Sequence, residues 1–151
     1  MRSRLGREVD RLVRGLADGE RQAVGFIDLR HGQGGDSASG EPGRGVLHQL
    51  RGWEGLVVRM EDKAWLQDYF VVDEYLNVLT VRDGIEELLD EMPGSLRGKV
   101  ERVVRRLDAR YRALTFEDGG AELGRYWRPL AEGREHRWWW TRTPVEPPRG
   151  W

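Results

Sequence analysis

The stretch from residue 83 to residue 116 contains two helical patterns that are joined by Met92-Pro93-Gly94. Proline lacks a backbone N–H and glycine readily adopts the conformations of a helix end, so this tripeptide interrupts a helix. Two helices separated by so short a break must fold back on one another. The sequence therefore predicts an antiparallel helical hairpin, around which the rest of the chain is expected to pack.

The second arm of this hairpin carries one apolar stripe, and Ser95 is placed to cap its first turn. The stripe consists of Leu96, Val100, Val103, Val104, Leu107, Tyr111 and Leu114. Its members recur three or four residues apart, as one face of an α-helix requires, and burying each contributes about 1.5–3 kcal/mol. The first arm begins at Asp83, which is also placed to cap. Its smaller stripe consists of Ile85, Leu88, Leu89 and Met92.

Charge is segregated along the chain although the formal net charge is only −1. Residues 61–91 hold ten acidic side chains against Lys63 and Arg82, a local net charge of −8. The second arm of the hairpin is rich in arginine. Separated charge of this kind suits electrostatically steered recognition of a partner.

The composition excludes several classes of site. Because there is no cysteine, the chain has no disulfide, no thiolate zinc site and no cysteine nucleophile. The basic first residues are not followed by the apolar region of a signal peptide, and no apolar run approaches 18 residues. We therefore expect a cytoplasmic protein with no membrane partner.

The first half of the chain alternates apolar segments with a glycine-rich one. Residues 3–17 predict a basic amphipathic helix that packs on its own domain. Residues 22–29 and 56–60 predict strands, which pair with each other across the segment between them. That segment includes residues 31–45, where six glycines predict a mobile loop.

Residues 62–79 fit two interpretations. The spacing of Trp65, Tyr69, Val72, Leu76 and Leu79 is helical. Residues 69–72 alone have the aromatic and β-branched character of a strand. We take the helix as the prediction for this segment.

The C-terminal third predicts a β-hairpin formed by residues 124–131 and 136–143. Residues 144–151 form a proline-rich tail that is expected to be extended. The predicted fold is thus a single α+β domain over residues 1–143, followed by this tail. It contains an N-terminal helix, a few antiparallel strands, the central helical hairpin and a C-terminal Trp-rich β-hairpin.

The four residues Arg30-His31-Gly32-Gln33 directly follow the predicted strand at residues 22–29. This motif resembles the signature of the histidine phosphatase (phosphoglycerate mutase-like) family. The resemblance implies that the histidine is transiently phosphorylated and that the arginine holds the phosphate. An imidazole is a good nucleophile and a guanidinium binds phosphate bidentately.

The rest of that family's catalytic set has no counterpart here. The family needs a second arginine and a second histidine, and neither His48 nor His136 stands in the expected setting. No pair of histidines has the spacing of metal ligands, and residues 31–45 lack the Gly-Lys-Ser/Thr of a phosphate-binding loop. We therefore predict no catalytic residue, no metal and no cofactor, and interpret His31 as a solvated loop histidine.

The most unusual segments are Arg125-Tyr126-Trp127-Arg128 and Arg137-Trp138-Trp139-Trp140-Thr141-Arg142. Three successive tryptophans on a strand cannot all face one core, because alternate side chains point to opposite sides. We therefore predict a partner-binding surface of arginines and aromatic rings. Its candidate residues are Tyr126, Trp127, Arg128, Arg137, Trp138, Trp140 and Arg142.

Three interpretations of this surface remain open. Tryptophan, tyrosine and arginine are the usual anchors of protein interfaces. The same residues suit stacking on single-stranded nucleic acid, although the sequence pI of 6.3 is low for that class. In the third interpretation Trp139 packs inward, while Trp138 and Trp140 stack on arginine and proline side chains, including Pro147 and Pro148.

The function we expect is a non-catalytic protein-interaction module such as an adaptor, a regulator or an immunity-like inhibitor. Nucleic-acid binding is the first alternative, and histidine-phosphatase-like phosphotransfer at Arg30-His31-Gly32 is the second. The partner we expect is another protein, and a homo-oligomer stays open.

Overall fold

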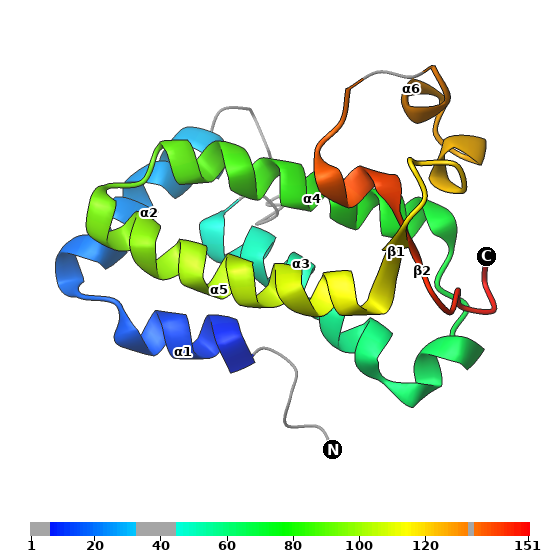
Figure 1. The fold of residues 1–151 in the computed structure, drawn as a ribbon. Helices are drawn as coiled ribbons and strands as arrows, with labels where there is room; N and C mark the ends of the chain where they lie inside the picture. The colour runs from blue at the N-terminus through cyan, green and yellow to red at the C-terminus, as the bar shows by residue number, and fades with distance from the viewer. Residues whose placement is uncertain (1–6, 33–44, 133–134) are drawn as a thin grey trace.

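The predicted helical hairpin is present in the computed structural model, which describes residues 7–32, 45–132 and 135–151. Helices α4 (Val72–Asp90) and α5 (Gly94–Leu114) lie on either side of the break and run antiparallel (Figure 1). The other described α-helices are α1 (Arg7–Gly15), α2 (Asp18–Gly32), α3 (Val46–Glu61) and α6 (Arg128–Ala131). The fold is mainly helical, and one small two-stranded sheet gives the α+β character that was predicted.

The apolar stripe of α5 is in the core as predicted. Its first six members are buried, and Leu114 is half-buried beside them. Ser95 is not the cap, because α5 begins one residue earlier and Pro93 takes the N-cap position. The predicted first arm from Asp83 is the second half of α4, which starts at Val72.

Helix α3 lies at the centre of the bundle and packs against α1, α2, α4 and α5. Its buried side chains include Leu50, Trp53 and Val57, which recur at helical spacing. The strand predicted at residues 56–60 is wrong, since these residues form the last turns of α3. Val58 is only half-buried. This fits a helix, in which one face is turned from the core, and does not fit a fully buried strand.

Helix α2 replaces the strand predicted at residues 22–29, so the predicted pairing with residues 56–60 is wrong as well. Val24 and Ile27 are buried, whereas Phe26 is 65% exposed. The apolar run thus splits between two faces of a helix. Most of the loop predicted at residues 31–45 lies outside the described residues, as does the start of the helix predicted at 3–17. The described part of that helix is α1, which ends at Gly15, two residues before the predicted end.

Residues 62–79 do not form one continuous helix. A short 3-10 helix, η2 (Lys63–Gln67), is followed by non-helical residues 68–71, and α4 starts at Val72. Asp62 caps η2 by accepting a hydrogen bond from the backbone N–H of Ala64 at 2.8 Å. This break separates the acidic α4 from α3 and turns the chain back along it.

The predicted C-terminal β-hairpin is wrong. Its residues form the 3-10 helices η3 (Leu123–Arg125) and η4 (Trp138–Thr141) and the helix α6. The sheet instead pairs β1 (Thr115–Glu117) with β2 (Arg142–Pro144) in antiparallel register, with Thr115 opposite Pro144. A 3-10 helix turns by about 120° per residue, so neighbouring tryptophans can face the same core, which a strand would forbid.

The tail at residues 145–151 packs on the domain. The backbone N–H of Gly150 donates to the carbonyl of Asp68 at 3.0 Å. The ring of Trp151 meets that of Tyr75 edge-on at 5.2 Å. In Figure 1 the chain end lies beside the start of α4.

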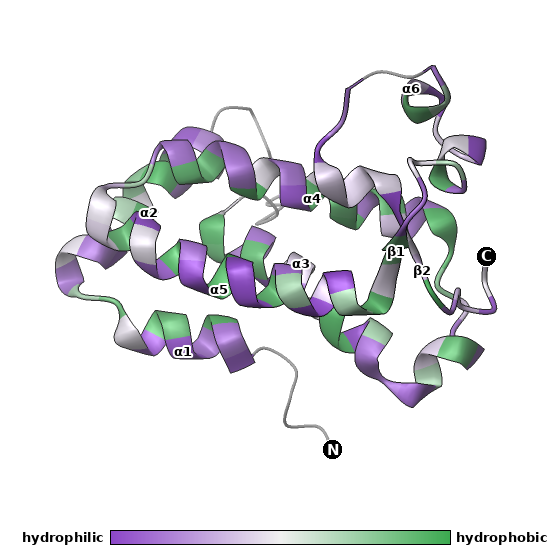
Figure 2. Cartoon of the chain, in the orientation of Figure 1, coloured by the Kyte–Doolittle hydropathy of each residue, from purple (hydrophilic) through white to green (hydrophobic). Residues whose placement is uncertain are grey.

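Hydropathy follows the amphipathic pattern of a helical bundle. Hydrophobic and hydrophilic segments alternate along the helices in Figure 2. The buried hydrophobic residues form one cluster that draws on α1 to α5 and on the C-terminal segment. Among the helices that the structure describes, none has both the length and the hydrophobicity to cross a bilayer.

Candidate functional site

The residues predicted to bind a partner do not form one exposed surface. Tyr126, Arg128 and Arg137 are exposed, whereas Trp140 is buried with 3% exposure. The three remaining candidates, Trp127, Trp138 and Arg142, are half-buried. Most of the aromatic surface expected from the sequence is therefore covered by the fold itself.

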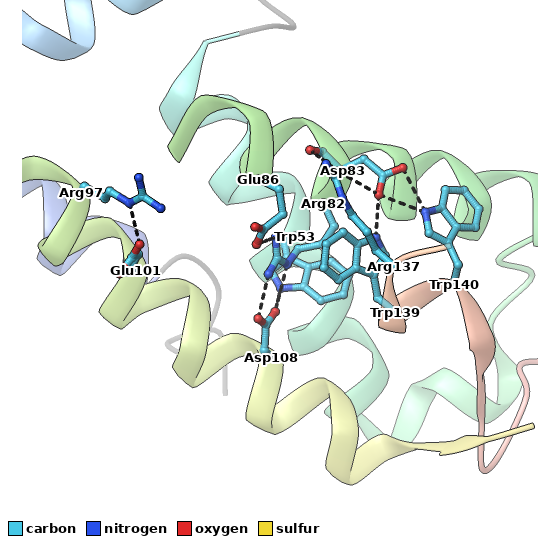
Figure 3. A network of polar contacts seen from close by, with 10 residues as sticks. All are labelled: Trp53, Arg82, Asp83, Glu86, Arg97, Glu101, Asp108, Arg137, Trp139 and Trp140. Carbon is cyan, nitrogen blue, oxygen red and sulfur yellow. Dashed lines mark hydrogen bonds and ion pairs between the residues drawn. The ribbon is translucent and has the colours of Figure 1, made fainter. Parts of the chain in front are cut away.

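Asp83 on α4 anchors the tryptophan segment through its carboxylate (Figure 3). The indole N–H of Trp139 donates to Oδ1 at 2.9 Å, and that of Trp140 donates to both oxygens at 3.0 Å. The guanidinium of Arg137 donates to the Asp83 carbonyl at 3.0 Å and lies 3.5 Å from the carboxylate. Asp83 thus contacts two residues of η4, Trp139 and Trp140, and its N-cap residue, Arg137.

Arg82, the neighbour of Asp83 on α4, holds the other side of this segment from within the core. It is only 2% exposed and donates twice to the carboxylate of Asp108, at 3.1 and 2.9 Å. Asp108 also accepts the indole N–H of Trp53 at 3.0 Å. Figure 3 shows the Arg82 side chain among these partners, and Glu86 completes the cluster with an ion pair at 2.7 Å.

The remaining rings of the predicted surface also pack within the fold. Trp140 stacks on Trp127 with 4.1 Å between ring centroids. The guanidinium of Arg112 lies 3.9 Å from the ring centroid of Trp138. Arg142 donates to the hydroxyl of Thr115 at 2.9 Å and so fastens β2 to β1. These contacts match the inward packing of Trp139 and the stacking on arginine. Trp140 also stacks on Trp127, and its stacking on Pro147 and Pro148 stays a prediction.

A groove of about 740 Å³ lies between α3, α4 and η2, and its volume is within the range of ligand-binding sites. Its apolar lining consists of Gly52, Gly55, Leu56, Val58, Ala64, Trp65, Phe70 and Val78. Its charged lining consists of Arg51, Arg59, Glu61, Asp62, Lys63 and Asp68. The groove could not be predicted from the sequence, because a strand at residues 56–60 and a single helix at 62–79 would not form it.

The wall formed by residues 65–70 is fixed by three separate contacts. Arg59 donates to both oxygens of Asp68, at 2.7 and 3.0 Å, and its guanidinium lies 4.5 Å from the ring centroid of Phe70. The indole of Trp65 donates to the carbonyl of Glu146 at 2.8 Å. The hydrogen bond from Arg59 lowers the pKa of Asp68 and raises that of Arg59. The tail therefore braces one wall of the groove.

Two glycines on α3 shape the floor in different ways. A Cβ on Gly52 would lie 3.3 Å from the Val81 side chain, so the missing side chain lets α3 and α4 approach closely. A Cβ on Gly55 would meet no described atom within 4 Å. Glycine in the interior of a helix costs about 0.5–1 kcal/mol relative to alanine. Packing does not require glycine at residue 55, where its effect is to keep the groove open.

The first three residues of the histidine motif lie on the last turn of α2 and do not follow a strand, and Gln33 lies outside the described residues. His31 Nε2 is paired with the Glu91 carboxylate, which also receives Arg30 at 3.3 Å. Both side chains thus join the end of α2 to Glu91 at the end of α4. Within the described residues no three His, Asp or Glu side chains are grouped so that they could hold a metal ion.

No protein family, curated protein or solved structure matches the chain at a significant level.

Proposed function

We propose that the protein is a non-catalytic protein-interaction module and that the groove between α3, α4 and η2 is its docking surface. The observation that carries this proposal is an open apolar groove of about 740 Å³ whose floor contains Gly55, a helical glycine that packing does not require. An exposed apolar groove rimmed by charged residues is typical of a binding site. Adaptor, regulator and immunity-like inhibitor are all roles that such a module can fill.

The shape of the groove favours a helical segment as its occupant. Lining residues extend along α3 from Arg51 to Glu61, which is a length of about 15 Å at 1.5 Å per residue. A furrow between two packed helices accepts the ridge of a third helix. An amphipathic helix that lays its apolar face into such a groove is a recurring mode of peptide recognition.

The residues first predicted to bind the partner have a smaller part in this proposal. Tyr126, Arg128 and Arg137 remain exposed, so their contribution to an interface stays a prediction. The nucleic-acid alternative has less support, because base stacking needs free ring faces. Trp139 and Trp140 are 2% and 3% exposed.

A substitution at Gly55 tests the proposed docking surface. Gly55→Phe places a ring in the groove at a position where a side chain meets no described atom. Gly98→Phe is the matched control, since Gly98 is also a helical glycine with open space at its Cβ but lies on α5 outside the groove. Circular dichroism and the thermal midpoint verify that both variants fold.

The readout is affinity capture from a lysate of the source cells, with and without nuclease. We expect the wild type and Gly98→Phe to retain one stoichiometric protein that Gly55→Phe loses. Equal retention by a folded Gly55→Phe variant would reject the groove as the docking surface. Capture that disappears with nuclease would support the nucleic-acid alternative instead.

A further inference from the structure

A second apolar surface lies on the outer face of α2. The side chain of Phe26 is 65% exposed and that of Leu29 is 54% exposed. Gln22 and Gly25 are also exposed and lie on the same face, because the four residues recur three or four positions apart. Within the described residues, these four line a hollow of about 630 Å³. We call this surface, formed by Gln22, Gly25, Phe26 and Leu29, the α2 patch.

The α2 patch is separate from both the core and the groove. Helix α2 packs on α3 and α5, and its buried residues Val24 and Ile27 lie on its other face. None of the described residues that line the groove belongs to α2. Large apolar side chains that are exposed together on a polar surface are typical of an interaction site.

The remainder of this chain offers little to cover the α2 patch. Residues 33–44 follow α2 directly, and their only apolar side chains are those of Ala38 and Pro42. Met1 and Leu5 belong to residues 1–6, which join α1 at its end away from α2. The occupant of the α2 patch is therefore expected in another molecule.

The α2 patch complements a copy of itself when two α2 helices pack antiparallel. A two-fold axis between residues 25 and 26 places Phe26 of one copy over Gly25 of the other, and Gln22 opposite Leu29. Each of the four positions then meets another member of the patch, as a two-fold interface requires. A Cβ on Gly25 would meet no described atom within 4 Å, so the incoming ring has open space there.

The charges on α2 also fit the antiparallel arrangement. Asp18 in the first turn is exposed and has no ion pair within the described chain. The arrangement places it within about one helical turn of Arg30 in the last turn of the other copy. Arg30 is 64% exposed beside Glu91, so its guanidinium is accessible. Arg21 donates to the Leu16 carbonyl at 3.2 Å, which turns its charge toward its own copy.

We infer that a second copy of this chain covers the α2 patch, so that the protein forms a two-fold dimer through antiparallel α2 helices. The inference goes beyond the proposed function and does not depend on it, because the dimer uses none of the described residues that line the groove. One helix from each copy makes a small interface. The dimer is therefore expected to be weak and to form as the protein concentration rises.

Sedimentation velocity over about 10 μM to about 1 mM of the full chain tests this inference. We expect the wild type to shift from monomer to dimer across this range. Phe26→Glu places two carboxylates close to the two-fold axis and should raise the dissociation constant of the dimer at least about tenfold. Phe116→Glu is the matched control, since Phe116 is 48% exposed on β1 and should leave the dimer unchanged. Circular dichroism verifies that both variants fold.

Cross-linking tests the geometry of the dimer. The chain has no cysteine, so one introduced cysteine reports on a single position. Gly25 and Gly19 are both exposed glycines of α2 with open space at the Cβ. The proposed axis sets the two copies of residue 25 about 1.5 Å apart along the helix and those of residue 19 about 20 Å apart. Mild oxidation should therefore link Gly25→Cys much faster than Gly19→Cys.

A protein that stays monomeric over the whole concentration range would overturn the dimer. So would a dimer that survives Phe26→Glu, or equal rates of cross-linking for the two cysteine variants. If a monomeric protein captures a cellular protein that Phe26→Glu loses, the α2 patch binds a different partner and the second copy is rejected. Gly55→Phe should leave the dimer intact, and its loss in that variant would mean that the groove, not the α2 patch, forms the contact.

Discussion

The guanidinium of Arg82 lies 4.1 Å from the ring centroid of Trp139, at the point where the C-terminal segment meets the helical bundle. Both side chains are buried, and the cation is neutralised by Asp108 on α5. A desolvated guanidinium over a tryptophan face contributes up to about 2 kcal/mol. The contact therefore joins α4, α5 and η4 in one cluster that no single element could form.

Substitution of Asp83, which binds this cluster from the half-exposed face of α4, should destabilise the protein. Asp83→Ala removes the acceptor of two buried indole N–H groups, and each buried donor left unsatisfied costs about 1–3 kcal/mol. We expect a loss of about 2–4 kcal/mol in the free energy of unfolding. Urea titration followed by tryptophan fluorescence measures it.

Asp90→Ala is the matched control for that experiment. Asp90 is also an acid on α4, but its side chain is 78% exposed and its nearest cation, Arg97, is 3.7 Å away. Exposed pairs of this kind contribute about 0–1 kcal/mol. Equal losses for Asp83→Ala and Asp90→Ala would show that Asp83 does not anchor the tryptophans.

The pair between Arg82 and Asp108 should behave as a buried ion pair. Asp108→Leu leaves the buried guanidinium without its main partner, and removing one member of such a pair costs about 3–5 kcal/mol. The double variant Arg82→Met with Asp108→Leu removes both charges and should lose less than Asp108→Leu alone. A double variant that is less stable than either single variant would contradict this account.

The helical hairpin could be predicted because its signal is local and long. Seven apolar residues at helical spacing and a Pro-Gly break leave one interpretation for α5. The strands predicted at residues 22–29 and 56–60 failed because short apolar runs fit a strand and a helix equally well. Residues 56–60 belong to a helix because α3 packs against α1, α2, α4 and α5. These tertiary contacts cannot be read from the sequence.

The groove could not be predicted for the same reason. It exists because α3, α4, η2 and the tail meet. Glu146 and Gly150 bind the wall from more than 80 residues further along the chain. The packing of the tryptophan segment could not be predicted either, because η4 is a 3-10 helix and turns successive rings toward partners such as Asp83 and Trp127.

Glu54 should make the stability of the protein depend on pH. It is 1% exposed on α3, and Oε2 accepts the backbone N–H of Glu8 on α1 at 2.8 Å. Burial raises the pKa of Glu54 above its ordinary value of 4.5. Folding therefore favours its protonated form, so its contribution is fully present below pH 4.5 and is lost as the pH rises through the raised pKa.

Glu54→Gln removes this titration while it keeps an oxygen for the Glu8 N–H. We expect the stability of the wild type relative to Glu54→Gln to fall as the pH rises above 4.5. Chemical unfolding of both proteins from pH 4 to pH 8, at about one-unit intervals, measures the difference. A difference that is constant or rises with pH would contradict a raised pKa for Glu54.

Gly55 and Gly52 should respond differently to alanine. Gly55→Ala adds a Cβ in open space and should stabilise the protein by about 0.5–1 kcal/mol, because glycine is the poorer helix former. Gly52→Ala brings its Cβ to 3.3 Å from Val81 and should gain less or lose stability. Thermal unfolding of the two variants gives the comparison, and equal gains would show that α3 and α4 do not pack closely at Gly52.

Gly150 should be required for docking of the tail against the groove wall. A Cβ at this position would lie 2.5 Å from the carbonyl carbon of Tyr69, a backbone atom that cannot move aside. Gly150→Ala should therefore break the hydrogen bond to Asp68 and detach the last residues, while the helices keep their circular dichroism.

Trypsin provides the readout for Gly150, because it cleaves after Arg149. We expect faster cleavage there in Gly150→Ala than in the wild type, measured by mass spectrometry at matched times. Gly15→Ala is the control, since a Cβ there meets no described atom within 4 Å. Because Trp65 donates to the Glu146 carbonyl in the same tail, release of the tail should also weaken docking of the partner in the groove. Unchanged cleavage after Arg149 would mean that the tail is not held through Gly150.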